Sequence, residues 1–173
     1  MRLAALAAAA LLAPTVAAAP DRPPRIVTIA VGHDRATGFV AGDGRVVTVA
    51  HVVVAGGEVM VDGRPATVVR VDRRNDLAVL RVAGLEGEAR IGGGEDTSLL
   101  GRSAPVVRRI SARVDGGPSR SAMEVRADVA VGDSGAPLVT RTGRVAGVVF
   151  ARSRTRAGTA YAVDATAVAA LLR

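Results

Sequence analysis

Short apolar runs separated by turn dipeptides dominate the chain after residue 24. In the first half these runs are Arg25–Gly32, Gly38–Ala41, Arg45–Val49, Glu58–Val61, Ala66–Val71 and Leu77–Val82. They are rich in valine and have the length of β-strands. The dipeptides Asp43-Gly44 and Asp62-Gly63 stand between such runs, and they accept the positive φ angles of tight hairpin turns. The pattern predicts about six strands before residue 83.

The second half repeats this pattern less regularly. After a looser stretch, Ala83–Ser103, the expected strands are Ala104–Val114, Met123–Val131, Leu138–Thr140, Val145–Ala151 and Thr159–Val163. Only Asp164–Arg173 has a helical period, with Asp164 at the N-cap and Ala165, Val168, Leu171 and Leu172 on one face. The simplest architecture is all-β, with two barrels or sheets and a short C-terminal helix. A single β-sandwich remains open.

The amino terminus has the features of a secretion signal. Met1-Arg2 is a positive start, Leu3–Leu12 is an apolar run, and Val16–Ala19 supplies small residues for cleavage. We expect a signal peptide over residues 1–18, cleaved after Ala18, and a linker over residues 19–24. The alternative is an uncleaved amphipathic or membrane-anchoring helix. Export predicts a secreted protein or one of the bacterial envelope or periplasm.

Composition excludes several classes of function. The 173 residues contain no cysteine and only two histidines, which argues against a catalytic metal site, so we expect no cofactor. The net charge is +7, and the chain has arginines but no lysine. The arginines are scattered and have no aromatic interleaving, so we expect no binding to nucleic acid and at most nonspecific attraction to anionic envelope polymers. We expect a monomer.

Three short motifs carry candidate chemistry. His51 lies in Val47–Val53 at the end of an expected strand, Asp76 opens the strand that begins at Leu77, and Ser134 lies in the turn Gly132-Asp133-Ser134-Gly135. Each motif alone is also typical of an ordinary structural residue. The order His, Asp, Ser is that of the chymotrypsin type of triad, whereas an α/β-hydrolase needs a histidine after its nucleophile and no His follows residue 51. A subtilisin order needs a helix-flanked parallel sheet, which one helix cannot provide.

These motifs and their surroundings resemble the trypsin-like serine proteases, in particular the short bacterial envelope branch that includes the high-temperature-requirement proteases. The matching segments are Thr37–Val40, Arg45–Val53, Asn75–Leu80, Gly132–Val139, Arg144–Val149 and Gly158–Val163. The resemblance implies hydrolysis of peptide bonds in protein or peptide substrates. It also implies two packed six-stranded antiparallel barrels, one over residues 25–84 with His51 and Asp76, the other over residues 85–173 with Ser134 and the terminal helix.

The resemblance assigns a role to each candidate residue. Ser134 would attack the scissile carbonyl, and His51 would take the serine proton and return it to the leaving amine. Asp76 would orient the imidazole and stabilise its charged form. The backbone N–H groups of Gly132 and Ser134 would form the oxyanion hole.

Substrate contacts are expected at Asp128, Val149, Phe150 and Ala151. Asp128 lies six residues before Ser134, where trypsin-like enzymes place the floor of the P1 pocket. A carboxylate there would select Arg or Lys at P1. Val129 and Val131 make its surroundings apolar, however, and a preference for small or aliphatic P1 residues is the alternative.

The sequence also departs from the family pattern. Ala136 replaces a second glycine after the nucleophile, and Phe150 stands where many relatives place a small polar residue that hydrogen-bonds the triad carboxylate. Ile26-Val27 resembles the new amino terminus of activated digestive relatives, but these residues are needed for the first strand. We therefore expect Asp133 to pair with an internal arginine. A pseudoprotease or an envelope-binding module on the same fold remains the alternative function.

Overall fold

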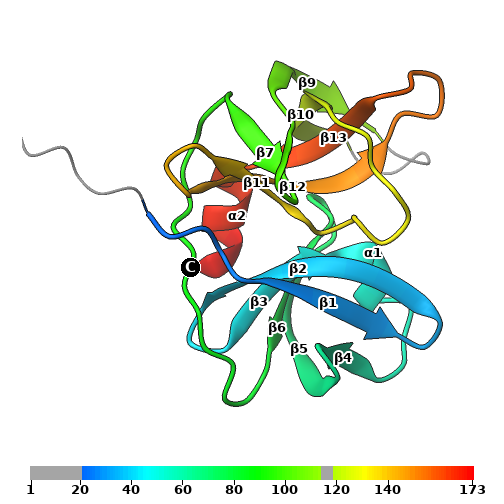
Figure 1. Cartoon of the computed structure of the whole chain (residues 1–173). Coiled ribbons are helices and arrows are strands. Elements are labelled where there is room, and N and C mark those ends of the chain that lie inside the picture. Colours follow the sequence, from blue (N-terminus) through cyan, green and yellow to red (C-terminus); the bar gives the residue numbers. More distant parts are fainter. Residues whose placement is uncertain (1–20, 114–118) are drawn as a thin grey trace, which may run out of the picture.

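The computed structural model describes residues 21–113 and 119–173, which form two β-rich halves and two helices (Figure 1). The expected signal peptide, residues 1–18, lies outside the described residues, as do the first two residues of the expected linker. Within the described residues, neither helix is both long enough and apolar enough to cross a membrane.

The first half is a closed barrel of antiparallel strands in the order β1-β2-β3-β6-β5-β4. Its strands are β1 (Ile26–Val31), β2 (Asp34–Gly42), β3 (Arg45–Val49), β4 (Val59–Val61), β5 (Arg64–Asp72) and β6 (Leu77–Arg81). All six lie where the apolar runs predict them. The hairpin dipeptides have positive φ at both residues, 51° and 69° at Asp43-Gly44 and 47° and 76° at Asp62-Gly63. These are the angles that a two-residue hairpin turn requires.

The second half is a seven-stranded sheet in the order β8-β7-β11-β12-β13-β10-β9. Its strands are β7 (Thr97–Leu99), β8 (Arg102–Ser103), β9 (Val106–Ala112), β10 (Arg120–Arg126), β11 (Pro137–Thr140), β12 (Val145–Arg152) and β13 (Thr159–Asp164). The all-β class with a C-terminal helix is confirmed, but hydrogen bonds between the described residues do not close this sheet into the expected six-stranded barrel. β8 has only two residues, both exposed, and offers too few backbone groups to continue the ladder to β9.

Two details of the predicted second half are wrong. The stretch Ala83–Ser103 contains the short strands β7 and β8, and the expected strand Met123–Val131 ends at Arg126. Val131 is 92% exposed, so its position in an apolar alternation does not reflect a buried strand face. The segment after β10 is instead a loop that leads to the candidate serine.

The terminal helix α2 (Ala165–Leu172) fastens the second half to the first. Asp164 caps it as predicted, because its carboxylate accepts hydrogen bonds from the backbone N–H groups of Thr166 and Ala167. At the other end, Arg45 of β3 and Arg70 of β5 donate to the last carbonyl oxygens of the helix, at 3.0 and 2.8 Å. These cations also complement the negative end of the helix dipole.

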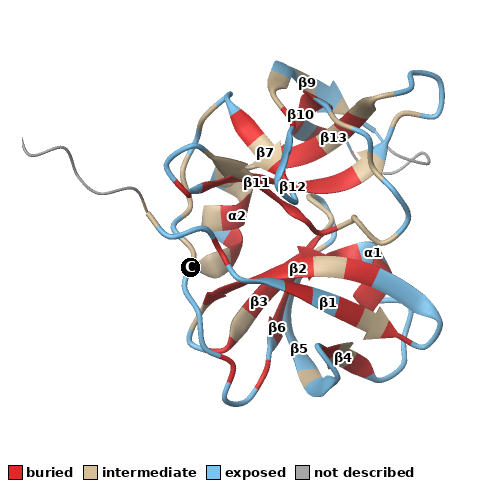
Figure 2. Ribbon diagram, viewed as in Figure 1, coloured by how far each residue is buried: buried red, intermediate tan, exposed pale blue. Residues whose placement is uncertain are grey.

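Buried residues occur along the strands of both halves (Figure 2). One cluster of buried side chains fills the first barrel and extends to Val148 of β12 and Val168 of α2. A second cluster lies within the second sheet, around Leu138 and Met123. The first cluster thus crosses the junction between the halves, which fixes how their loops face each other.

Candidate active site

His51 lies on α1 (Ala50–Val53), a four-residue helix that follows β3 directly. The prediction placed His51 at the end of a strand, but the strand ends at Val49 and the chain turns there. Val52 and Val53 are buried against the barrel, while the His51 side chain is 49% exposed. Burial of the two valines therefore anchors the turn and leaves the imidazole at the surface.

Asp76 holds His51 through both carboxylate oxygens. Its Oδ1 accepts the backbone N–H of His51 at 2.8 Å, and its Oδ2 lies 2.7 Å from the imidazole Nδ1. The backbone carbonyl of Asp76 also accepts the N–H of Ala50 at 3.0 Å. Asp76 has a φ of 58°, a left-handed conformation that aspartate tolerates better than most residues. With Nδ1 as the donor to Oδ2, the imidazole keeps Nε2 available to accept a proton.

The hydrogen bond to Asp76 raises the pKa of His51 above its ordinary value of 6.5. Burial opposes this rise because it disfavours the charged imidazolium. Among the nearby charges, the Asp76 carboxylate raises the pKa further, Arg120 lowers it and Asp34 raises it. The pKa of His51 thus depends on two carboxylates and one guanidinium, which come from three separate segments of the chain.

Ser134 lies in the loop between β10 and β11, and this loop is bonded to the first barrel. The carbonyl of Ser134 accepts the N–H of Thr37 of β2 at 2.8 Å, and the Thr37 hydroxyl donates to the carbonyl of Gly132 at 2.7 Å. On its other side, the N–H of Gly135 donates to the carbonyl of Val149 at 2.7 Å. The serine is therefore held between the two halves of the molecule, close to the strand pair that leads to His51.

Gly135 approaches the first barrel so closely that no side chain fits there. A Cβ at this position would lie 1.9 Å from the Thr37 carbonyl oxygen and 2.6 Å from the Thr48 hydroxyl. Thr48 precedes His51 by three residues, and its hydroxyl donates to the same Thr37 carbonyl at 2.7 Å. This contact sets the position of the Ser134 loop relative to the end of β3.

The structure brings His51 and Asp76 into direct contact but does not bond Ser134 to His51. Within residues 21–113 and 119–173, no hydrogen bond joins the two side chains. Likewise, no acceptor in these ranges bonds the N–H groups of Gly132 or Ser134. Catalytic hydrogen bonds are often formed only when the substrate is bound. The roles of the triad and the oxyanion hole therefore stay predictions.

Asp133 is paired inside the protein, as expected. Its carboxylate accepts the N–H of Ala130 at 3.0 Å and lies 3.5 Å from the guanidinium of Arg102. Ile26 meanwhile is the first residue of β1. In this structure the carboxylate beside the candidate serine is thus paired with an internal arginine, while Ile26-Val27 takes part in the barrel.

A groove of about 830 Å³ lies beside the Ser134 loop and contains Asp128. Its lining comes from Arg102, Ala127–Ala130 and Arg152–Thr159. The other expected substrate contacts are not part of this lining: Ala151 is partly buried, and Val149 and Phe150 are buried. The side chains of these last two residues therefore do not face a peptide, and the backbone N–H and C=O of Val149 already bond Ala136 and Gly135.

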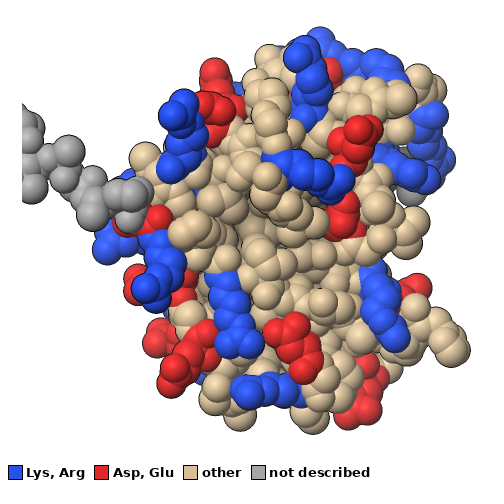
Figure 3. Space-filling model, in the orientation of Figure 1, with Lys and Arg blue, Asp and Glu red and all other residues tan. Residues whose placement is uncertain are grey.

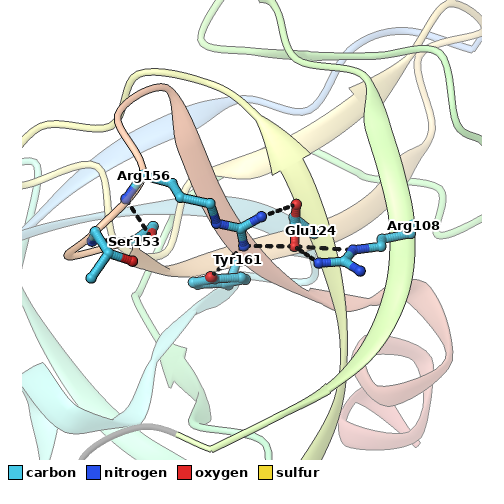
Figure 4. A network of polar contacts seen from close by, with 6 residues as sticks. Arg108, Glu124, Ser153, Arg156 and Tyr161 are labelled. Carbon is cyan, nitrogen blue, oxygen red and sulfur yellow. Dashed lines mark hydrogen bonds and ion pairs between the residues drawn. The ribbon is translucent and has the colours of Figure 1, made fainter.

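A cluster of polar side chains that the sequence did not predict bonds Arg156, a lining residue of this groove, to the sheet (Figure 4). Glu124 of β10 is buried and accepts hydrogen bonds from Arg108 of β9 and, through both its oxygens, from Arg156. Arg156 also donates to the hydroxyl of Tyr161. The hydrogen bonds from Arg156 and Arg108 lower the pKa of Glu124 below its ordinary value of 4.5. The cluster thus ties the loop between β12 and β13 to the sheet.

Arg120, at the start of β10, is a second residue that the predicted site lacks. Its side chain is 7% exposed, and its Nη1 lies 3.7 Å from Oδ2 of Asp76. A lone arginine in an alternating strand gives no sign of this contact, because Asp76 belongs to the other half of the chain.

No cluster of three or more His, Asp or Glu side chains suited to a metal ion occurs in the part of the chain that the structure describes.

Comparisons with known proteins agree with this arrangement. The family described as trypsin-like peptidase domain matches residues 36–148. The chain is 34% identical over 161 residues to serine protease Rv3671c of Mycobacterium tuberculosis strain H37Rv, with 79% of this chain and 41% of the relative covered. It therefore spans about two fifths of the length of the curated relatives it matches.

Solved structures show the same likeness. The crystal structure of the active form of Rv3671c protease from M. tuberculosis has a TM-score of 0.76 and 28% identity, covering 97% of this chain and 93% of that chain. The HtrA-type protease AlgW with tripeptide has a TM-score of 0.73 and 19% identity, covering 87% and 60%, and this likeness concerns the fold alone. With a family match over more than half of its residues, the chain belongs to the trypsin-like peptidase domain family.

Proposed function

We propose that this chain is a serine endopeptidase that hydrolyses peptide bonds through a His51–Asp76–Ser134 triad. The observation that carries the proposal is the contact of 2.7 Å between His51 Nδ1 and Asp76 Oδ2, at the junction to which the Ser134 loop is bonded. Membership of a peptidase family supports the same reaction.

The proposed reaction proceeds in two steps. Ser134 Oγ attacks the scissile carbonyl carbon while Nε2 of His51 takes the hydroxyl proton, and the C–N bond breaks as that proton passes to the leaving amine. Water then attacks the acyl-enzyme with the same histidine as the base, which releases the acid and restores the serine. The N–H groups of Gly132 and Ser134 would stabilise the oxyanion, and removing one such donor typically costs roughly 3 to 4 kcal/mol of barrier.

Asp76 supports this chemistry in two ways. Its bond to Nδ1 selects the tautomer in which Nε2 accepts a proton, and its charge stabilises the imidazolium that forms. Its bond to the His51 N–H also fixes the backbone from which the imidazole projects. Replacing Asp76 by asparagine would remove the charge and favour the wrong tautomer.

Labelling with a fluorophosphonate probe tests the proposal. We expect the wild-type protein to be labelled and Ser134→Ala and His51→Ala to lose labelling while their unfolding midpoints stay close to that of the wild type. Ser121→Ala is the matched control, because this serine is exposed on β10 and should leave labelling unchanged. A folded wild-type protein that does not react would favour the pseudoprotease alternative.

The protein's location and partners form part of the same proposal. We propose export by a signal peptide over residues 1–18, a monomeric state, and protein or peptide substrates. Charges of both signs are spread around the face shown in Figure 3, with mostly uncharged atoms between them. This distribution favours weak, nonspecific attraction to anionic envelope polymers over a dedicated binding surface. Sequencing the amino terminus of the exported protein, expected at Ala19, tests the cleavage site.

A further inference from the structure

Arg120 brings a buried positive charge to the carboxylate that holds the candidate base. Its Nη1 lies 3.7 Å from Oδ2 of Asp76, and His51 Nδ1 lies 2.7 Å from that same oxygen. The two nitrogens are therefore no more than about 6.4 Å apart. Arg120 comes from the second half of the molecule, whereas Asp76 and His51 belong to the first barrel.

Phe150 supports the other side of this guanidinium. The ring of Phe150, on β12, lies beneath Arg120, with its centroid 4.9 Å from the guanidinium carbon. Phe150 is 4% exposed, so both partners of this cation–π contact are shielded from water. Such contacts are stronger when desolvated. The ring and the carboxylate thus fix the guanidinium from two directions.

The surroundings of Arg120 do not satisfy its hydrogen-bonding capacity. Its Nε and Nη1 are buried and have no hydrogen-bond partner among the described residues. An unsatisfied buried donor on a charged group is costly, and an apolar residue of similar volume often stabilises a protein as well as a buried ion pair does. Stability alone is thus a poor reason for an arginine at this position.

We propose that Arg120 is a positioning residue of the candidate triad, which fixes the Asp76 carboxylate and, through it, the imidazole of His51. The inference rests on the proposed function, because it assigns Arg120 a task only if His51 is the base. In this role Arg120 and Phe150 together replace the small polar residue that relatives place beside the triad carboxylate.

The charges that face His51 give the proposal an observable consequence. They are Asp76 before β6, Asp34 on β2 and Arg120 on β10, and of these only Arg120 lowers the pKa of the histidine. Its charge offsets part of the effect of the two carboxylates and keeps more of the imidazole in the neutral form that accepts a proton. Removing the charge should therefore raise the pKa of His51.

Titration of His51 by NMR measures this effect without requiring activity. In Arg120→Met the midpoint of His51 should rise by about half a pH unit even if the dielectric were that of bulk water, and by more in the partly buried site. Arg120→Lys should keep the midpoint of His51 near that of the wild type.

Two further variants separate positioning from a general loss of stability. Arg45→Met removes a different arginine, 31% exposed, which bonds the end of α2 and does not face His51, and it should leave the His51 midpoint unchanged. Arg120→Gln takes the place of Arg120→Met if the latter does not fold. A folded Arg120→Met or Arg120→Gln protein in which neither the His51 midpoint nor kcat changes overturns the proposal.

Kinetics complete the test. Arg120→Met should lower kcat on the order of tenfold to a hundredfold, the range that a small displacement of a catalytic group produces, with KM little changed. The rising limb of its pH–rate profile should move to higher pH, and Arg120→Lys should recover part of kcat. A moved midpoint with unchanged kcat overturns the positioning role, whereas loss of probe labelling in the wild type overturns the proposed function instead.

Discussion

Two glycines of the Ser134 loop offer a matched test of how the two halves are joined. Gly132 and Gly135 have similar positive φ angles, 98° and 91°. A Cβ on Gly132 would meet nothing within 4 Å, whereas a Cβ on Gly135 would lie 1.9 Å from the Thr37 carbonyl oxygen. Alanine at either position therefore meets the same kind of backbone strain, but only Gly135→Ala also meets the first barrel.

The expected difference follows from the bonds around Thr37. Backbone strain from an L-residue at such φ values costs about 1 to 2 kcal/mol, which should be the whole loss in Gly132→Ala. In Gly135→Ala the Thr37 peptide must also move, which breaks the bonds that Thr37 makes with Thr48, Ser134 and Gly132. At about 1 kcal/mol for each net hydrogen bond, the additional loss is about 2 to 3 kcal/mol.

Urea unfolding measures these losses. We expect Gly135→Ala to lower the free energy of unfolding by about 4 kcal/mol with an unchanged m-value, which for a domain of this size lowers Tm by about 10 °C. Gly132→Ala should lose less than half as much. Equal losses in the two variants would refute the conclusion that the contact between Gly135 and Thr37 joins the halves, because strain alone would then account for both.

Three other predictions concern pH and specificity. The pKa of His51 is raised above 6.5, so kcat/KM should rise as the pH passes through a value above 6.5, and a flat profile from acidic to neutral pH would contradict a histidine base. The pKa of Glu124 is lowered, so this group stabilises the fold above about pH 4.5 and the contribution is lost as the pH falls towards the folded value. Urea unfolding should thus separate Glu124→Gln from the wild type clearly at pH 7 and much less near pH 3. Asp128 shares its groove with four arginines, so a library of P1 residues should show a preference for small or aliphatic residues that Asp128→Ser leaves unchanged. A basic preference that this substitution abolishes would instead place Asp128 at the pocket floor.

The strands of the first barrel could be predicted because the residues that specify each strand and its turn are close together in the sequence. Each strand of that half combines an apolar run with a neighbouring turn signal, and Asp43-Gly44 and Asp62-Gly63 have the φ angles that their sequence requires. The second half depends more on pairing between distant segments. β7 and β8 are too short to show a period, and Val131 continues an apolar alternation although the strand has already ended.

The candidate site also combines residues that the sequence identifies with residues that only the folded structure brings together. The family motifs identify His51 and Asp76, and the structure joins them by hydrogen bonds. The strand Arg45–Val49 was predicted at its observed bounds, but α1 was missed because a helix of four residues is too short to show a helical period. Arg120 could not be found at all, since its contact with Asp76 exists only after the two halves have packed together.

Phe150 shows why a departure from a family pattern has to be interpreted together with its surroundings. A phenylalanine cannot donate a hydrogen bond to a carboxylate, so the sequence alone indicates that Asp76 has lost support at this point. A small polar residue would support Asp76 by one short hydrogen bond but would offer no surface on which a guanidinium could rest. The phenylalanine ring offers that surface, and the arginine on it supplies a full charge at 3.7 Å instead of a hydrogen bond. Arg120 and Phe150 therefore act together, and neither alone would replace the small polar residue of the family pattern.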